Sequence, residues 1–270
     1  MALFKTSVIS KITLFLVAAM LSVSAMATDF SQVERLIKQN NGDAKTQVII
    51  GAAYYHGQGV SQNSAKAFEW FEKAAKQGDS GAQVLLGAMY SEGEGVRQDF
   101  AKAVEWYQKA ANQGDVNAQY NLGLMYYEGK GISQNSAKAV EWYQKAANQG
   151  YASAQYNLGM MYYEGKGVRQ DFAKAVEWNK KAANQGHASA QYNLGLMYYE
   201  GKGVRQDFTK AVEWNKKAAN QSYASAQYNL GLMYYEGKGV RQNLATAKEY
   251  FGKACDNGLQ VGCNKYRILN

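Results

Sequence analysis

The 270-residue sequence has no proline, only two cysteines and only two histidines. Because proline interrupts helix interiors, its absence together with many alanine, lysine, glutamate and glutamine residues favours a nearly all-helical chain. The histidines, His56 and His187, are too few and too far apart in sequence for a zinc cluster or a histidine-based triad, and we expect both at the surface. Beyond residue 27 the chain also lacks the S-x-x-K and G-x-S-x-G motifs of serine hydrolases. These absences predict a protein with no catalytic residues, no metal site and no cofactor.

Long apolar runs are also missing, except near the N-terminus. Lys5 and Lys11 precede the apolar run Ile12 to Val23, and the small residues Ala25 and Ala27 follow it. This order is typical of a secretory signal peptide, and the run is too short to span a bilayer. We therefore predict a signal peptide over residues 1–27, cleaved after Ala27. The mature chain is expected in the periplasm or secreted, without membrane contact.

The rest of the chain is dominated by a period of 36 residues. The stretch AQYNLGLMYYEGKGISQNSAKAVEWYQKAAN, which begins at Ala118, returns almost unchanged from Ala154, Ala190 and Ala226, and looser copies begin at Thr46 and Ala82. A fixed period of this length indicates a stacked repeat architecture, in which each unit buries its apolar face against its neighbours. The sequence predicts six repeats, over residues 46–81, 82–117, 118–153, 154–189, 190–225 and 226–261.

The formal net charge is +8, and it falls to +6 without the predicted signal peptide, which contains Lys5 and Lys11. This excess forms no basic block, because the last four repeats carry only one or two positive units each. A nucleic-acid-binding surface usually gathers its positive charge on one face or along one stripe. A solvated charged surface is therefore the preferred interpretation, and we expect no nucleic-acid partner.

Each repeat is predicted to contain two helices, here called helix A and helix B. In the third repeat, Asp115 is a plausible N-cap of helix A and Gly129 ends it, while Ser136 marks the start of helix B. Gly123, in the middle of helix A, predicts that another helix approaches closely there. One helix B position holds all five tryptophans, which we interpret as a repeated core anchor, at Trp70, Trp106, Trp142, Trp178 and Trp214.

The pattern A-x-x-x-L-G-x-x-Y-x-x-G-x-G-V, followed by K-A-x-x-W-x-x-K-A-A-x-x-G as in Ala154 to Gly186, resembles the Sel1-like repeat. This repeat is a relative of the tetratricopeptide repeat, and the resemblance extends from Thr46 to Val261. It implies an all-α fold, a right-handed α-α solenoid with helices A on the concave side and helices B on the convex side. It also implies an adaptor or scaffold role. Residues 28–45 and 262–270 are expected to form terminal capping helices, because an open end of a solenoid exposes an apolar face.

The two cysteines, Cys255 and Cys263, lie near the end of the last helix B and at the start of the C-terminal cap. In an exported protein such a pair is interpreted first as a disulfide, with two free buried thiols as the alternative and a metal site as a weaker one. Some secreted, cysteine-rich proteins of the resembling family link repeats with the same spacing, which favours the disulfide. Some of them are also labelled β-lactamases.

A stripe of residues on helix A faces away from the set that includes Leu122 and Tyr126, so we expect it to be exposed on the concave side. Rings interleaved with asparagines suit an extended peptide, although the stripe could also have been copied passively by duplication. This tyrosine stripe contains Tyr120, Asn121, Leu124, Tyr127, Tyr156, Asn157, Met160, Tyr163, Tyr192, Asn193, Leu196, Tyr199, Tyr228, Asn229, Leu232 and Tyr235.

Two functions follow from these observations. The first is an exported, non-catalytic scaffold, expected to be monomeric, that binds a protein or peptide on the tyrosine stripe. The alternative is a cell-envelope hydrolase that acts on β-lactam or peptidoglycan-type substrates, as the resemblance implies. The absence of a nucleophile motif favours the scaffold.

Overall fold

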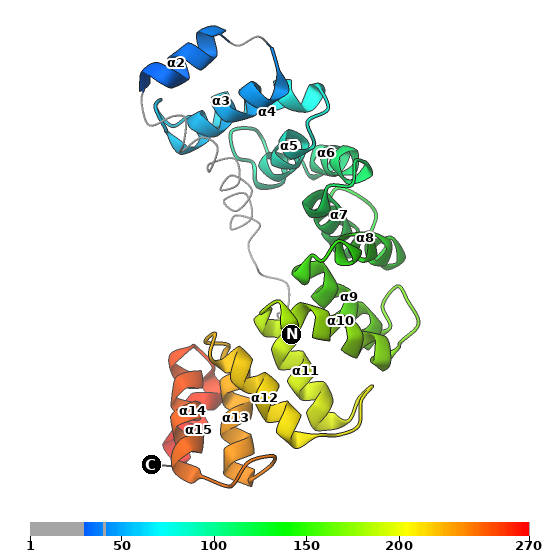
Figure 1. The fold of residues 1–270 in the computed structure, drawn as a ribbon, viewed down its shortest axis with the longest axis vertical. Helices are drawn as coiled ribbons and strands as arrows, with labels where there is room; N and C mark the ends of the chain where they lie inside the picture. Colours follow the sequence, from blue (N-terminus) through cyan, green and yellow to red (C-terminus); the bar gives the residue numbers. More distant parts are fainter. Residues whose placement is uncertain (1–29, 40–41, 270) are drawn as a thin grey trace. The chain divides into compact units, whose positions relative to one another are not determined.

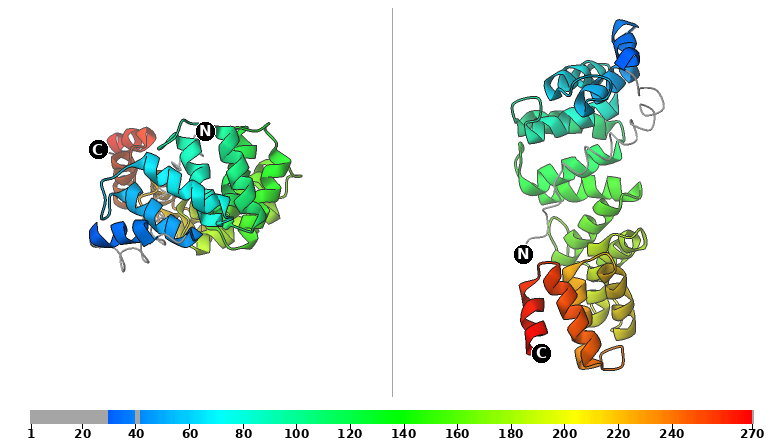
Figure 2. Two further views of the ribbon diagram at one scale, coloured as in Figure 1. Left: turned by 90° about the horizontal axis from the view of Figure 1, so that it is seen from above. Right: turned by 90° about the vertical axis from the view of Figure 1, so that its left-hand side faces the viewer.

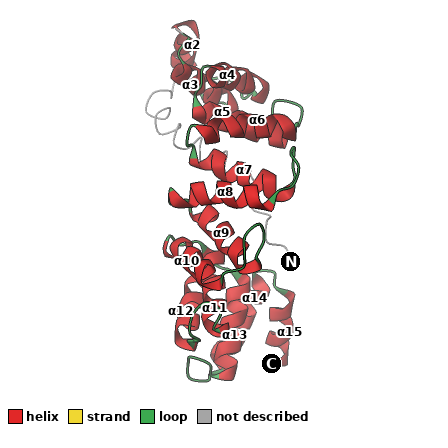
Figure 3. Ribbon diagram, turned by 90° about the vertical axis from the view of Figure 1, so that its right-hand side faces the viewer, coloured by secondary structure: helices red, strands yellow, loops and turns green. Residues whose placement is uncertain are grey.

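The computed structural model describes residues 30–39 and 42–269 (Figure 1). The predicted signal peptide lies outside these residues and stays a prediction. In the part of the chain that the structure describes, all regular elements are helices (Figure 3). This all-α arrangement of consecutive helix pairs confirms the expected fold class. The helices A are α3 (Ala44–His56), α5 (Ser80–Glu92), α7 (Val116–Glu128), α9 (Ala152–Glu164), α11 (Ala188–Glu200) and α13 (Ala224–Glu236). The helices B are α4 (Ser64–Lys76), α6 (Phe100–Asn112), α8 (Ser136–Asn148), α10 (Phe172–Asn184), α12 (Phe208–Ala219) and α14 (Leu244–Asp256).

The chain forms two compact units, and the boundary between them lies between Asn135 and Ser136. In the first unit, α2 (Phe30–Gln39) precedes the repeats and places the fully buried Val33 against Ala53 of α3. In the second unit, α15 (Gln260–Ile268) follows the last repeat and packs along α14, as the orange and red helices of Figure 2 show. Each unit therefore has an additional helix at the end where its repeats stop.

Local sequence signals define the ends of helix A as predicted. The Asp115 carboxylate accepts hydrogen bonds from the backbone N–H groups of Asn117 and Ala118, both at 2.9 Å. At the other end, Gly129 has a left-handed φ of 69° and donates its N–H to the carbonyl oxygen of Met125. A residue with a side chain is strained at that φ, which explains the glycine at this position.

The glycine in the middle of helix A allows helix B to approach closely, as expected. A Cβ atom added at Gly87 would lie only 2.6 Å from Cε1 of Tyr107, whose ring is fully buried. The same relation holds in the first repeat, where Phe71 covers Gly51. Because the ring needs the volume that a methyl group would fill, the glycine is required for packing and not for a special backbone conformation.

A glutamine pair also joins the two helices of the first, second, fourth and fifth repeats. In the second repeat, Gln113 Nε2 donates to Gln83 Oε1 at 2.8 Å, and Gln83 Nε2 donates to the carbonyl oxygen of Ala75 in the preceding helix B at 3.1 Å. Gln83 is buried, so both of its polar atoms need partners. The pair therefore satisfies a buried amide while it links neighbouring repeats.

The tryptophans differ from the prediction that they anchor the core. Trp178 is buried, but Trp70, Trp106, Trp142 and Trp214 are only half-buried, and the residue after each of them lies deeper in the core. Every tryptophan has a lysine three residues later whose Nζ lies 3.8–4.2 Å from the ring centroid. A cation at this distance over an indole is attracted by the ring's electron-rich face, which keeps one side of the ring near solvent.

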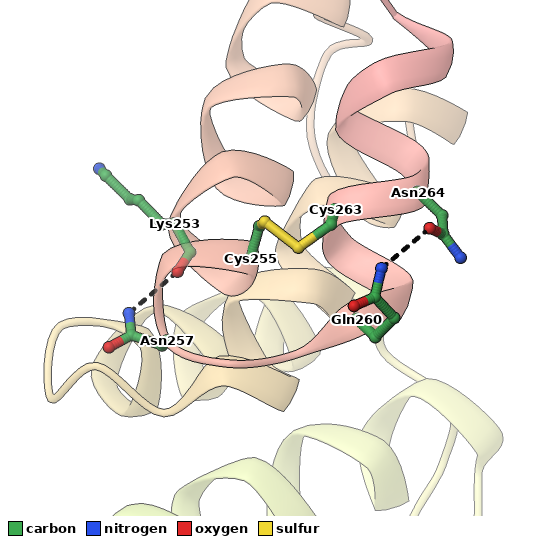
Figure 4. The surroundings of a disulfide bond; sticks show 6 residues. All are labelled: Lys253, Cys255, Asn257, Gln260, Cys263 and Asn264. Carbon is green, nitrogen blue, oxygen red and sulfur yellow. Dashed lines mark hydrogen bonds between the residues drawn. A yellow bond between two sulfur atoms is a disulfide. The ribbon is translucent and has the colours of Figure 1, made fainter.

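Cys255 and Cys263 form a disulfide, which agrees with the first interpretation of the pair (Figure 4). The bond joins the last turn of α14 to the first turn of α15. In the same corner, Asn257 donates to the carbonyl oxygen of Lys253 at 2.9 Å. The disulfide and the hydrogen bond hold the turn that connects α15 to the last repeat.

Candidate interaction face

The tyrosine stripe is less exposed than the helical-wheel argument predicted. Tyr120 and Tyr156 are each only 5% exposed, and Asn121 and Asn157 are buried as well. Their predicted exposure is therefore wrong. Tyr192, Asn193, Tyr228 and Asn229 are half-buried.

For Tyr156 and Tyr192 the cause is the residue that directly precedes the next helix A, because its ring lies over the tyrosine. The His187 ring stacks on Tyr156 with centroids 4.8 Å apart, and the Tyr223 ring packs on Tyr192 at 5.3 Å. His187 also caps α11, because its Nδ1 accepts the backbone N–H of Ala190 at 3.3 Å. Desolvation in this stack raises the pKa of Tyr156 to about 12. A helical wheel considers one helix alone, so it could not include this cover.

The stripe asparagines also contact the neighbouring repeat. The Tyr156 side chain is hydrogen-bonded with Asn193, and Tyr192 with Asn229. Asn193 Nδ2 lies 2.9 Å from the Met160 sulfur. These amides therefore have a role in holding repeats together, in addition to any role in binding a peptide backbone.

The second tyrosine of each stripe segment keeps accessible surface. Tyr163 accepts a hydrogen bond from Lys202 Nζ at 2.9 Å, and Tyr199 accepts one from Lys238 Nζ at 2.7 Å. Tyr235, in the last repeat, is 41% exposed. We define the accessible stripe as Tyr163, Tyr199 and Tyr235 together with the half-buried Leu124, Tyr127, Met160, Leu196 and Leu232.

The first two repeats replace this lysine. Glu94 occupies the lysine position in the second repeat, and it accepts a hydrogen bond from the Tyr55 hydroxyl at 2.7 Å. Burial raises the pKa of Glu92 above its ordinary value, and the charge of Glu94 raises it further.

Burial also lowers the pKa of His56. His56 is half-buried and not fully at the surface as predicted. Among the described residues, no group of three His, Cys, Asp or Glu side chains is arranged to hold a metal ion.

A cavity of about 140 Å³ lies between α11, α12 and α13 in the second unit. Four stripe residues line it, namely Leu196, Tyr199, Asn229 and Leu232. The other lining residues are Glu200 of α11, Asn215 of α12 and Met233 of α13. Asn215 was not among the predicted site residues, although its position signals a difference, since Phe71, Tyr107, Tyr143 and Phe251 have rings at the equivalent positions.

Among the described residues, no helix is both long enough and apolar enough to cross a bilayer.

The helix pairs, the close approach at the glycines and the shared glutamine bonds define an α-helical repeat protein. The sequence profile of the Sel1 repeat family matches six consecutive stretches, residues 44–79, 80–115, 116–151, 152–187, 188–223 and 224–259. The chain therefore belongs to the Sel1 repeat family. Each matched stretch begins two residues before the corresponding repeat boundary expected from the sequence.

Solved structures agree with this assignment. The chain is 38% identical to a protective antigen of uropathogenic Escherichia coli with an SLR fold, with a TM-score of 0.84 over 88% of this chain and 50% of that one. This chain thus spans half the length of that antigen. It is 35% identical to a Sel1 repeat protein from Oxalobacter formigenes, with a TM-score of 0.79 over 96% of this chain and 76% of that one. Among functionally curated proteins, no significant match was found.

Proposed function

We propose that this protein is an exported, non-catalytic scaffold that binds a protein or peptide partner on the accessible part of the tyrosine stripe. Repeats of the Sel1 and tetratricopeptide kind usually mediate protein interactions, which supports a binding role. The observation that supports this face is the recurrence of half-buried or exposed apolar and aromatic side chains on four successive helices A. These side chains are Leu124, Tyr127, Met160, Tyr163, Leu196, Tyr199, Leu232 and Tyr235.

The burial found in the structure changes which residues we assign to contact. Tyr120, Asn121, Tyr156 and Asn157 are enclosed by the protein, so they support the face from within. Half-buried rings and aliphatic side chains lose little conformational entropy on binding and provide apolar area, as anchors at protein interfaces do. The contact set is therefore the accessible stripe alone.

Three features support export. The first 27 residues have the order of a signal peptide. The Cys255–Cys263 disulfide is typical of an oxidising compartment. The similar Escherichia coli protein is described as a protective antigen. Mass spectrometry of the protein from its native host should find a mature chain that begins at Thr28, and a chain that retains Met1 in the cytoplasm would contradict the proposal.

The binding face can be tested with a photo-crosslinking amino acid placed at single positions in living cells. At Tyr127 and Tyr235 it should yield the same adduct, because both positions lie on the accessible stripe. Glu105 and Glu213, which are exposed on helices B, are the matched controls and should yield no adduct. Equal adducts from all four positions, or adducts from the controls alone, would refute this face.

Nothing in the comparisons supports the hydrolase alternative. Purified mature protein incubated with nitrocefin or with muropeptides is expected to show no turnover above a heat-denatured sample.

A further inference from the structure

Charge is distributed unequally between the two compact units. The second unit, residues 136–270, contains 18 lysine and arginine residues and 10 aspartate and glutamate residues, so its formal net charge is +8. In the first unit, residues 28–135 contain 10 basic and 12 acidic residues and have a net charge of −2. A net charge of the first kind attracts acidic partners. Most of the accessible stripe belongs to the second unit and therefore lies in a basic environment.

Two tyrosines of the accessible stripe are each paired with a lysine of the following repeat. Lys202 Nζ donates to the Tyr163 hydroxyl at 2.9 Å, and Lys238 Nζ donates to the Tyr199 hydroxyl at 2.7 Å. Each lysine also forms an ion pair with the glutamate two residues before it, at 2.9 and 2.8 Å. Both lysine side chains remain 42% exposed, so a partner can approach them.

Each of these Tyr–Lys pairs keeps hydrogen atoms that it can donate. A tyrosine hydroxyl that accepts a hydrogen bond from lysine retains its own O–H, and an ammonium group has three N–H donors. One N–H points to the tyrosine and one to the glutamate, so one N–H remains beside the tyrosine O–H. The two donor atoms are 2.9 or 2.7 Å apart. At this spacing the two oxygens of one carboxylate can accept both hydrogen bonds.

The first unit has the opposite arrangement at the equivalent place. Glu94 occupies the lysine position there, and the Tyr55 hydroxyl donates its hydrogen to it at 2.7 Å. That hydroxyl hydrogen is already used, and the negative charge of Glu94 repels a second carboxylate. An acidic group is therefore favoured in the second unit and disfavoured at this place in the first.

We propose that the accessible stripe of the second unit binds an extended peptide with acidic side chains, one carboxylate on each Tyr–Lys pair. This inference rests on the proposed scaffold function and specifies the chemistry of the partner. Apolar side chains of the peptide pack on Leu196 and Leu232, which line the same cavity as Tyr199. The glutamates that alternate with the lysines repel the closely spaced charges of a nucleic acid or an anionic membrane, so a peptide with separated charges fits better.

The first test selects binders from a random-peptide display library on the full-length mature protein. The enriched peptides should contain aspartate or glutamate interspersed with apolar residues. Their binding should weaken as NaCl is added, because salt screens exposed charges. Enrichment of basic or uncharged peptides would overturn the proposal.

Substitution of the two lysines tests the site itself. The double variant Lys202→Gln, Lys238→Gln should bind a selected acidic peptide at least about ten-fold more weakly, since it loses a charged hydrogen bond at each site. The matched control Lys180→Gln, Lys216→Gln removes the same charge from exposed positions on helices B and should leave the affinity almost unchanged. Equal weakening by both double variants would indicate a general attraction and refute the site. Undiminished binding by the folded stripe variant would also refute it.

A second double variant, Tyr163→Phe, Tyr199→Phe, keeps both rings and both lysines and removes only the hydroxyl groups. It should bind the same peptide about five-fold more weakly, because each carboxylate loses one of its two hydrogen bonds. A folded phenylalanine variant that binds as tightly as the wild type would contradict the paired contact.

Crosslinking from the accessible stripe separates this proposal from the general one. If the enriched peptides are uncharged but crosslink at Tyr127 and Tyr235, the acidic partner is wrong and the scaffold face stands. If no stripe position crosslinks a partner in cells, the scaffold function fails, and this proposal fails with it. If duplex DNA or phosphatidylglycerol vesicles bind through Lys202 and Lys238 more tightly than every selected peptide, the ligand is another polyanion and the proposal is wrong.

Discussion

The close packing of helix A on helix B predicts that Gly87→Ala destabilises the protein, although alanine favours helices. The new Cβ would lie 2.6 Å from Tyr107 Cε1. Ordinary contacts between carbon atoms are about 3.5–4.0 Å, so the ring would have to move by roughly 1 Å. Tyr107 is completely buried, so the neighbouring atoms resist this movement. The change therefore forces two helices apart or distorts a core ring.

The magnitude follows from two opposing effects. Overpacking of a core costs about 1–3 kcal/mol, and the rigid neighbour places this site near the upper end. The better helix propensity of alanine returns about 1 kcal/mol. We expect a net loss of about 2 kcal/mol in the free energy of unfolding. The matched control is Gly252→Ala in α14, where the nearest atom is Tyr266 Cε2 at 3.2 Å. Tyr266 is 37% exposed and can shift, so this variant should be neutral or more stable.

Urea unfolding followed by circular dichroism would measure both variants. Hydrogen exchange in α5 and α6 would localise the effect, because stability in a repeat protein is a sum of local contributions. In a Tyr107→Ala background the Gly87→Ala change should become neutral or stabilising, since the obstructing ring is gone. A Gly87→Ala protein as stable as the wild type, with Tyr107 present, would refute the packing argument.

Three further predictions concern stability. Replacing both Cys255 and Cys263 by serine should remove about 2.5 kcal/mol in the chain-entropy model for so short a loop, detected as faster hydrogen exchange in α15; unchanged exchange would contradict it. Burial and the charge of Glu94 raise the pKa of Glu92 in the folded protein. Ionisation of this carboxyl group therefore destabilises the fold relative to its protonated form. Glu92→Gln should therefore match the wild type in Tm below the ordinary pKa and exceed it increasingly as the pH rises to neutral; a constant difference would argue against this. Asp99 caps α6 by accepting the Lys102 backbone N–H at 3.0 Å, so Asp99→Ala should cost about 1 kcal/mol in urea unfolding, while no loss would exclude the cap.

Several features were predictable from the sequence because short-range chemistry controls them. Asp115 caps helix A and Gly129 ends it in the structure, since each acts on backbone groups within a few residues. The 36-residue period predicted the repeated helix pairs, and the central glycine predicted the close approach of helix B. The cysteine pair predicted a disulfide because the chain is expected to be exported and because the spacing resembles that of cysteine-rich proteins of the same family; the structure contains this bond.

The tertiary structure alone decided which stripe residues are accessible. Tyr156 has an outward direction on its own helix, but His187, the N-cap residue of the next helix A, stacks on it and buries it. Likewise, Gly195 lies against the Asn215 amide and Leu196 lines the same cavity, although both belong to the preceding helix A and not to the helix of Asn215. Helical periodicity tells which residues share a side of one helix, because that depends on local backbone geometry. Burial and cavities depend on what the neighbouring repeat places against that side, and no single-helix pattern contains that information.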